Sequence, residues 1–227
     1  MKRLSIKAVA VASLALVSLW GCSDYHTGPS WVVPGSGRLV TEVRPVDGFS
    51  IVAVSDAARL IVEQTGVESL QITAEDNVLP LLQSEVRNGR LSLGLVPGSD
   101  VIPTRQIEYR LTVRQLDVVE ASGASRVEFA GVDGEQLAFH LSGASSATAS
   151  GSLRGLELHL SGASWVQAPD LRSRLVAASL SGVSYGLVRA SGRLDASLSG
   201  ASTLEYFGDP VVVSSVSGGS VVRRVGP

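Results

Sequence analysis

Hydrophobic and polar residues alternate along much of this chain, in the pattern of β-strands that each bury one face. Leu156, Leu158 and Leu160 are spaced by two, with Glu157 and His159 between them. A short break and a second alternating run follow, and this unit of two runs recurs along the chain with no helical periodicity inside it. The pattern therefore predicts an all-β protein.

A tetrapeptide, first seen as Ser122-Gly123-Ala124-Ser125, marks the break in every unit. Its six copies begin at Ser122, Ser142, Ser161, Ser181, Ser199 and Ser217, in steps of 20, 19, 20, 18 and 18 residues. A second break lies midway between the copies, at Gly131, Gly151, Pro169-Asp170, Gly192 and Gly208-Asp209-Pro210. Each unit therefore predicts a strand, a corner, a strand and a turn. Stacked at about 4.8 Å, the spacing of paired strands, the units predict a parallel β-helix with turns of 18 to 20 residues.

The corner leaves two side-chain arrangements open. Gly suits a corner because it reaches positive φ without steric cost. Strict alternation from Leu160 would place Gly162 and Ser164 inside and Ala163 outside, whereas a one-residue bend at the glycine would place the alanine inside. We favour the bend, because Gly in a strand usually marks one. An antiparallel propeller or barrel would use the same strands, but its blades need about twice this period.

Residues 44–118 predict a less regular N-terminal part of a single domain that spans residues 44–227, with the repeat stack at 119–227. Residues 75–82 suggest one or two helical turns, with Asp76 or Asn77 as N-cap. Residues 85–95 predict a hairpin around a type I′ turn at Asn88-Gly89.

The start of the chain predicts an export signal. Lys2, Arg3 and Lys7 precede an apolar run at residues 8–19 that is too short to span a bilayer easily. Leu19-Trp20-Gly21-Cys22 then resembles a bacterial lipobox, which implies a signal peptide at residues 1–21 and acylation of Cys22. An ordinary signal peptide followed by a chance cysteine is the alternative. Acyl chains at Cys22 would anchor the protein to a membrane.

Ser23 bears on the destination of the protein. By resemblance to enterobacterial sorting, a residue other than Asp after the lipidated cysteine favours the outer membrane. Residues 22–43 are rich in Pro and Gly and predict a linker between the lipid and the domain.

Charge and composition exclude several functions. The formal net charge is −2, and loss of the three leader cations would make it −5, so nothing indicates nucleic-acid binding. The only lysines are Lys2 and Lys7, which leaves no Schiff-base lysine after cleavage, and a single cysteine excludes an intramolecular disulfide. No HExxH motif or phosphate-binding loop is present, so we expect no cofactor. The outward acids are dispersed rather than paired: Glu128, Glu157, Asp195 and Glu205.

Aligning the tetrapeptides places residues of successive units in outward columns. The column two positions before each corner contains Glu120, His140, His159, Ser179, Ser197 and Ser215. His140, His159 and Glu120 are candidate ligands for Zn²⁺ or Cu²⁺. We favour a solvated surface ladder without metal, because structural sites normally need four ligands.

The column just after each corner contains Arg126, Ser146, Trp165, Tyr185, Thr203 and Val221. Trp165 and Tyr185 would lie on adjacent turns, where exposed aromatic side chains can bind a glycan or a protein partner. Cross-strand packing that stabilises the sheet is the alternative interpretation, and the one we favour.

The apolar strands at residues 211–225 end the stack and would leave an open edge. Either Arg223, Arg224 and Pro227 protect this edge, or two stacks associate end to end through it.

Four features together resemble one known family. They are Arg44-x-Val46-x-Gly48-Phe49, Glu75-Asp76-Asn77-x-Leu79, Gly89-x-Leu91 and the repeated Leu-Ser-Gly-Ala-Ser. Over about residues 44–210 they resemble the putative auto-transporter adhesin head, or GIN, domain family. The resemblance implies a right-handed parallel β-helix on an exported, often lipid-anchored, bacterial protein without established catalytic residues. We therefore expect a non-catalytic, adhesin-like binding or structural module of the cell envelope. A polysaccharide lyase or hydrolase on the same scaffold is the alternative.

Overall fold

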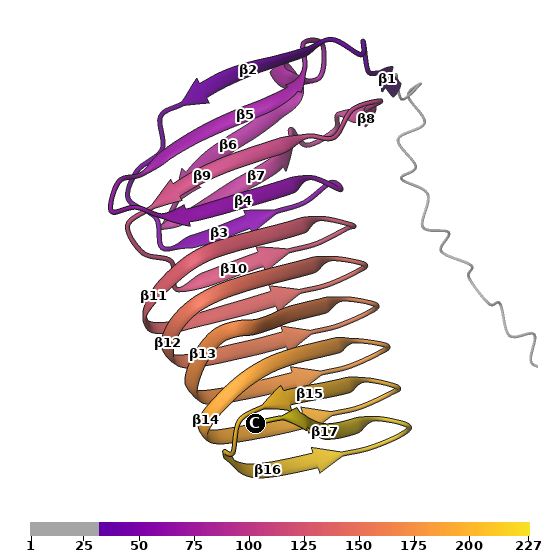
Figure 1. Ribbon diagram of the computed structural model, residues 1–227. Coiled ribbons are helices and arrows are strands. Elements are labelled where there is room, and N and C mark those ends of the chain that lie inside the picture. The colour runs from indigo at the N-terminus through magenta and orange to yellow at the C-terminus, as the bar shows by residue number, and fades with distance from the viewer. Residues whose placement is uncertain (1–31) are drawn as a thin grey trace, which may run out of the picture. The chain divides into compact units, whose positions relative to one another are not determined.

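A computed structural model describes residues 32–227, which belong to one compact unit. The predicted signal peptide and Cys22 lie outside the described residues. The described part is nearly all β and forms a β-solenoid of about five turns, which confirms the predicted fold class (Figure 1).

The solenoid has two layers of strands. The first layer contains β6 (Leu82–Arg87), β7 (Arg90–Leu95), β3 (Ile51–Val54), β10 (Val118–Ala121) and β16 (Val211–Val216). The second contains β2 (Leu39–Arg44), β5 (Ser69–Glu75), β9 (Glu108–Val113), β4 (Arg59–Gln64), β15 (Thr203–Phe207) and β17 (Val221–Gly226). Four long strands pass through both layers: β11 (Arg126–Leu141), β12 (Ser146–Leu160), β13 (Trp165–Leu180) and β14 (Tyr185–Leu198). Two short strands, β1 (Val32–Pro34) and β8 (Asp100–Ile102), pair separately.

The four long strands correct one expectation, because the second break of their units does not interrupt the strand. Only the break at Gly208-Asp209-Pro210 separates two strands, β15 and β16. Each long strand instead bends from one layer into the other at the edge opposite the tetrapeptide corners (Figure 1). Shifts of register mark the bends, for example between Ala168 and Arg172 where β13 pairs with β14. A bulge lets a strand turn without losing its ladder, so glycine at these positions indicates a bend rather than a loop.

Parallel pairing places equivalent residues of successive coils over one another. Leu141 pairs with Leu160, Leu160 with Leu180 and Leu180 with Leu198, and all four are buried. The outward columns follow the same register, with His140 beside His159 and Trp165 beside Tyr185. Because side chains alternate between faces along a strand, one register fixes both the core and the surface.

At the corners, the favoured bend was wrong. Ala163 is exposed and Ser164 is buried, as strict alternation requires, although Gly162 is exposed rather than inside. The Ser164 hydroxyl donates a hydrogen bond to the Ser161 carbonyl at 2.9 Å. The glycine adopts a left-handed conformation, with φ of 75° at Gly162, and this turns the chain so that the serine can close the corner.

The N-terminal end of the stack is closed by antiparallel pairs, β2 with β5, β5 with β9 and β6 with β7. The predicted hairpin is confirmed, and positive φ values at Asn88 and Gly89 match its type I′ turn. The helix is a single 3₁₀ turn, η1 (Leu79–Leu81), and its N-cap is Val78 rather than Asp76 or Asn77. Those two side chains instead bind the chain around residues 34–38. Among residues 32–227, no helix is long and apolar enough to cross a membrane.

The N-terminal boundary of the domain differs from the sequence interpretation. Strand β1 lies within residues 22–43 and β2 begins there, so ordered strand begins inside the segment interpreted as a linker. The buried carboxylate of Glu75 accepts hydrogen bonds from the amides of Gly37 and Thr104, which fastens β2 to the stack. At the other end, Val211, Val213 and Val216 are exposed on the last coil.

Candidate functional site

An open groove of about 830 Å³ lies beside the tetrapeptide corners of the first layer. Successive coils contribute the same two positions to it, so that it runs along the stack. One set of lining residues is the outward column of the sequence analysis, and these members are Glu120, His140, His159, Ser179 and Ser197. The other is the first serine of each corner, namely Ser122, Ser142, Ser161, Ser181 and Ser199.

The groove owes its polarity to the register. The hydrophobic residues that flank each outward residue are buried in the core, so the positions between them face solvent. Serine hydroxyls both donate and accept hydrogen bonds, and imidazoles supply one of each when neutral. The groove therefore presents similar polar groups at regular intervals of one strand spacing, which suits a ligand with a repeating polar structure.

His140 and His159 lie edge to face in the middle of the groove, with ring centroids 4.7 Å apart. His159 Nε2 is 2.6 Å from Glu157 Oε1. Glu120, the third candidate ligand, instead accepts a hydrogen bond from Arg90. Within residues 32–227, no three His, Cys, Asp or Glu residues are grouped to hold a metal ion. The histidine pair is thus brought together, but the third ligand has another partner.

The outward carboxylates are bound by arginine, histidine or tyrosine side chains. Arg59 binds Glu128, Arg193 binds Asp195, and Arg223 with Tyr185 binds Glu205; Glu157 is bound by His159. Hydrogen bonds from these partners lower the pKa values of Glu128, Asp195 and Glu205. A general acid needs a raised pKa, so these carboxylates are poorly suited to protonate a glycosidic oxygen.

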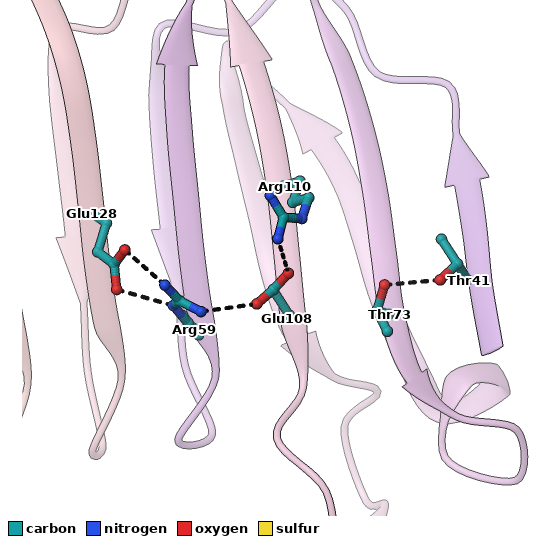
Figure 2. A network of polar contacts seen from close by, with 6 residues as sticks. All are labelled: Thr41, Arg59, Thr73, Glu108, Arg110 and Glu128. Atoms are coloured by element: carbon teal, nitrogen blue, oxygen red, sulfur yellow. Dashed lines mark hydrogen bonds and ion pairs between the residues drawn. The ribbon is translucent and has the colours of Figure 1, made fainter. Parts of the chain in front are cut away.

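The second layer carries a charge ladder across three strands near its N-terminal end (Figure 2). Arg59 makes a two-pronged contact with Glu128, at 2.9 and 2.8 Å, and reaches Glu108 at 3.1 Å. Arg110 binds the other oxygen of Glu108 at 2.8 Å. The ladder joins β11, β4 and β9 and has its charges paired within the chain, which indicates a structural role.

Trp165 and Tyr185 are register neighbours in the second layer, outside the groove. Both are half-buried, and the Tyr185 hydroxyl donates to Glu205 at 2.7 Å. Burial, followed by this hydrogen bond and the charge of Glu205, raises the pKa of Tyr185 to about 12. The pair therefore forms the predicted column, but one of its polar groups already has a partner.

The sequence interpretation missed the wall of the groove supplied by Arg90 and Gln83. Both come from the hairpin of β6 and β7, which continues the first layer by pairing with β3. No repeat relates this hairpin to the coils, so no column could reveal the contact between Arg90 and Glu120.

Comparison with known proteins identifies relatives of this fold. A family model described as "Putative auto-transporter adhesin, head GIN domain" matches residues 48–210. A crystal structure of a putative adhesin from Bacteroides fragilis is similar, with a TM-score of 0.68, 20% identity, and coverage of 86% of this chain and 100% of that one. A putative adhesin from Parabacteroides merdae gives 0.53 at 17% identity, covering 85% and 98%. A putative lipid binding protein from Parabacteroides distasonis gives 0.51 at 16%, covering 85% and 99%. No curated protein matches the chain.

Proposed function

Because the chain belongs to the family of putative auto-transporter adhesin head (GIN) domains, we propose that it is a non-catalytic binding module of the cell envelope. The family model and two of the three similar structures named above are described as putative adhesins, which supports an exported or cell-surface protein. The solenoid supplies a long, regular surface for contact, and the engaged outward carboxylates favour binding over catalysis.

The ligand we propose for the groove is an extended glycan chain. The observation that carries this proposal is the double file of serine hydroxyls and imidazoles along one groove of about 830 Å³. Sugar units bear hydroxyls at regular intervals and can exchange hydrogen bonds with such files. The apolar side chains that also line the groove add contact area, as in most ligand sites.

Attachment to the membrane is part of the same proposal. Acylation of Cys22 would hold the domain at the cell envelope, with the outer membrane as its destination. Mass spectrometry of the protein from its membrane fraction tests this point: a diacylglyceryl group on Cys22 supports it, and an unmodified Cys22 contradicts it.

A glycan array with the purified chain tests the binding function. Ser179→Tyr would fill the groove without touching the core, since Ser179 points outward. Gln167→Tyr is the matched control, because it places the same side chain outward on the same strand in the other layer. We expect glycan binding by the parent and the control, and loss of binding by Ser179→Tyr.

Two results would overturn the proposal. One is an array on which the parent binds no glycan. The other is binding that survives Ser179→Tyr but is lost in Trp165→Ala, which would move the site to the patch formed by Trp165 and Tyr185.

A further inference from the structure

A second recess, of about 420 Å³, lies where the chain bends between the layers, at the edge opposite the corners. Three arginines line it, Arg172, Arg174 and Arg189, together with the hydroxyl-bearing residues Ser152 and Ser191. We propose that this recess, named here the arginine pocket, binds the carboxylate or sulfate group of an acidic saccharide.

Unequal coil lengths accompany the pocket. Strand β13 has 16 residues and β14 has 14, and their register shifts on both sides of the paired residues Arg172 and Arg189. The longer bend of β13 therefore does not match that of β14. Gly192 allows close approach at this point, because a Cβ there would lie 2.9 Å from the Arg174 carbonyl oxygen.

The charges in the pocket are unbalanced. Arg172 and Arg189 are direct partners in the β13–β14 ladder, and like charges in this position repel. Among residues 32–227, neither Arg172 nor Arg174 makes an ion pair, whereas Arg154 and Arg193 near the same edge pair with Glu135 and Asp195.

A carboxylate also lines the pocket, but it already forms an ion pair with an arginine outside the pocket lining. Asp209 lies 3.3 Å from Arg224 and is almost fully exposed. Three arginines therefore face one carboxylate that is already paired. A bound oxyanion would relieve the repulsion and give the guanidinium groups the planar partner that they bind best.

Arg189 is held in place by contacts with residues outside the pocket lining. Its Nε donates to the Pro169 carbonyl at 2.9 Å, its Nη1 donates to the Pro227 carbonyl at 3.3 Å, and its guanidinium lies 4.8 Å from the centroid of the Phe207 ring. A side chain fixed before binding loses little entropy when the ligand arrives.

The size of the pocket favours an anionic group on a larger body. Its volume of about 420 Å³ exceeds what a single oxyanion occupies. The buried side chains of Leu153 and Ala190 also line it, beside the hydroxyl groups of Ser152 and Ser191. This mixture of apolar and hydroxyl surface next to cations suits a sugar ring that bears a sulfate or carboxylate.

The test compares the affinities of the purified full-length chain for glucose 6-sulfate, galacturonate, inorganic sulfate and glucose by calorimetry at constant ionic strength. We expect both anionic sugars to bind more tightly than glucose and inorganic sulfate. Arg172→Gln and Arg174→Gln should each weaken anionic-sugar binding at least about tenfold, the loss typical of a hydrogen bond to a charged group. Arg154→Gln removes the same charge from an already paired position and should bind like the parent.

Thermal unfolding gives an independent readout. Without ligand, Arg172→Gln should unfold at the same temperature as the parent or higher, because the repulsion with Arg189 is removed. Glucose 6-sulfate should raise the Tm of the parent but not that of Arg172→Gln. Equal weakening by Arg154→Gln, equal affinity for glucose, or binding of inorganic sulfate as tight as that of the sugar sulfate would each overturn the proposal. These probes are monosaccharides in a pocket outside the groove, so their result is independent of the array experiment with Ser179→Tyr.

Discussion

The corner glycines should differ in their tolerance of alanine, and the difference measures how tightly the coils stack. Gly182 and Gly123 occupy the same position of the tetrapeptide and have similar φ values of 77° and 73°. An alanine Cβ at Gly182 would lie 2.6 Å from the Gly162 carbonyl oxygen and 3.1 Å from its nitrogen. At Gly123, its nearest neighbour would be the Asp56 nitrogen at an ordinary 3.5 Å.

The expected loss of stability in each variant is the sum of up to two free-energy costs. Both variants place alanine in a left-handed conformation, at about 1–2 kcal/mol. Only Gly182→Ala also collides with a main-chain atom that cannot move freely, because the Gly162 carbonyl accepts the Val183 N–H at 2.8 Å. Forcing extra atoms into a packed site adds about 1–3 kcal/mol. Gly182→Ala should therefore destabilise by about 2–5 kcal/mol in total, and Gly123→Ala by about 1–2 kcal/mol.

Urea unfolding followed by circular dichroism measures both free energies of unfolding. Gly66→Ala provides the cost of the backbone alone, because Gly66 has φ of 84° and no atom within 4 Å of the position of a Cβ. Since solenoids can unfold coil by coil, hydrogen exchange of the corner amides should accompany the equilibrium measurement. Equal losses in Gly182→Ala and Gly123→Ala would refute the reasoning, since the contact with the preceding coil would then carry no cost.

Three further predictions concern the corners, the charge ladder and the open end. Ser164→Ala should cost about 1 kcal/mol in urea unfolding by losing its hydrogen bond, whereas Ser145→Ala should be neutral or stabilising, because that buried hydroxyl has no partner among the described residues. Arg59 lowers the pKa of Glu128, so the ion pair stabilises the folded state above the ordinary glutamate pKa of about 4.3, and this stabilisation is lost as the pH falls through the lowered pKa. A difference in urea midpoint between the parent and Glu128→Gln that persists at pH 2 would contradict this. If the exposed last coil mediates end-to-end association, sedimentation should show a mass that rises with concentration and is restored to the monomer by Val216→Arg; a parent monomer at all concentrations excludes it.

The columns could be predicted from the sequence because period and register are linked. Once the tetrapeptides are aligned, parallel pairing leaves little freedom, and His140 lies beside His159 as the spacing requires. The orientation of Ala163 could not be obtained in the same way. It depends on a two-residue turn with one left-handed glycine, and both a bend and strict alternation are compatible with the same letters.

What the sequence could not supply are the features in which the coils differ. Arg90 reaches Glu120 from a hairpin outside the repeat, and the arginine pocket lies where β13 is two residues longer than β14. A repeat predicts what its units share, because the shared residues build the core and the ladder. Binding sites on a solenoid can arise instead where one unit differs from the others in length or sequence. Each such difference produces a local structure with its own contacts. In a chain of this kind, an arginine that lacks the acidic partner of its neighbours, such as Arg172, is therefore a better guide to a ligand than the repeated serines alone.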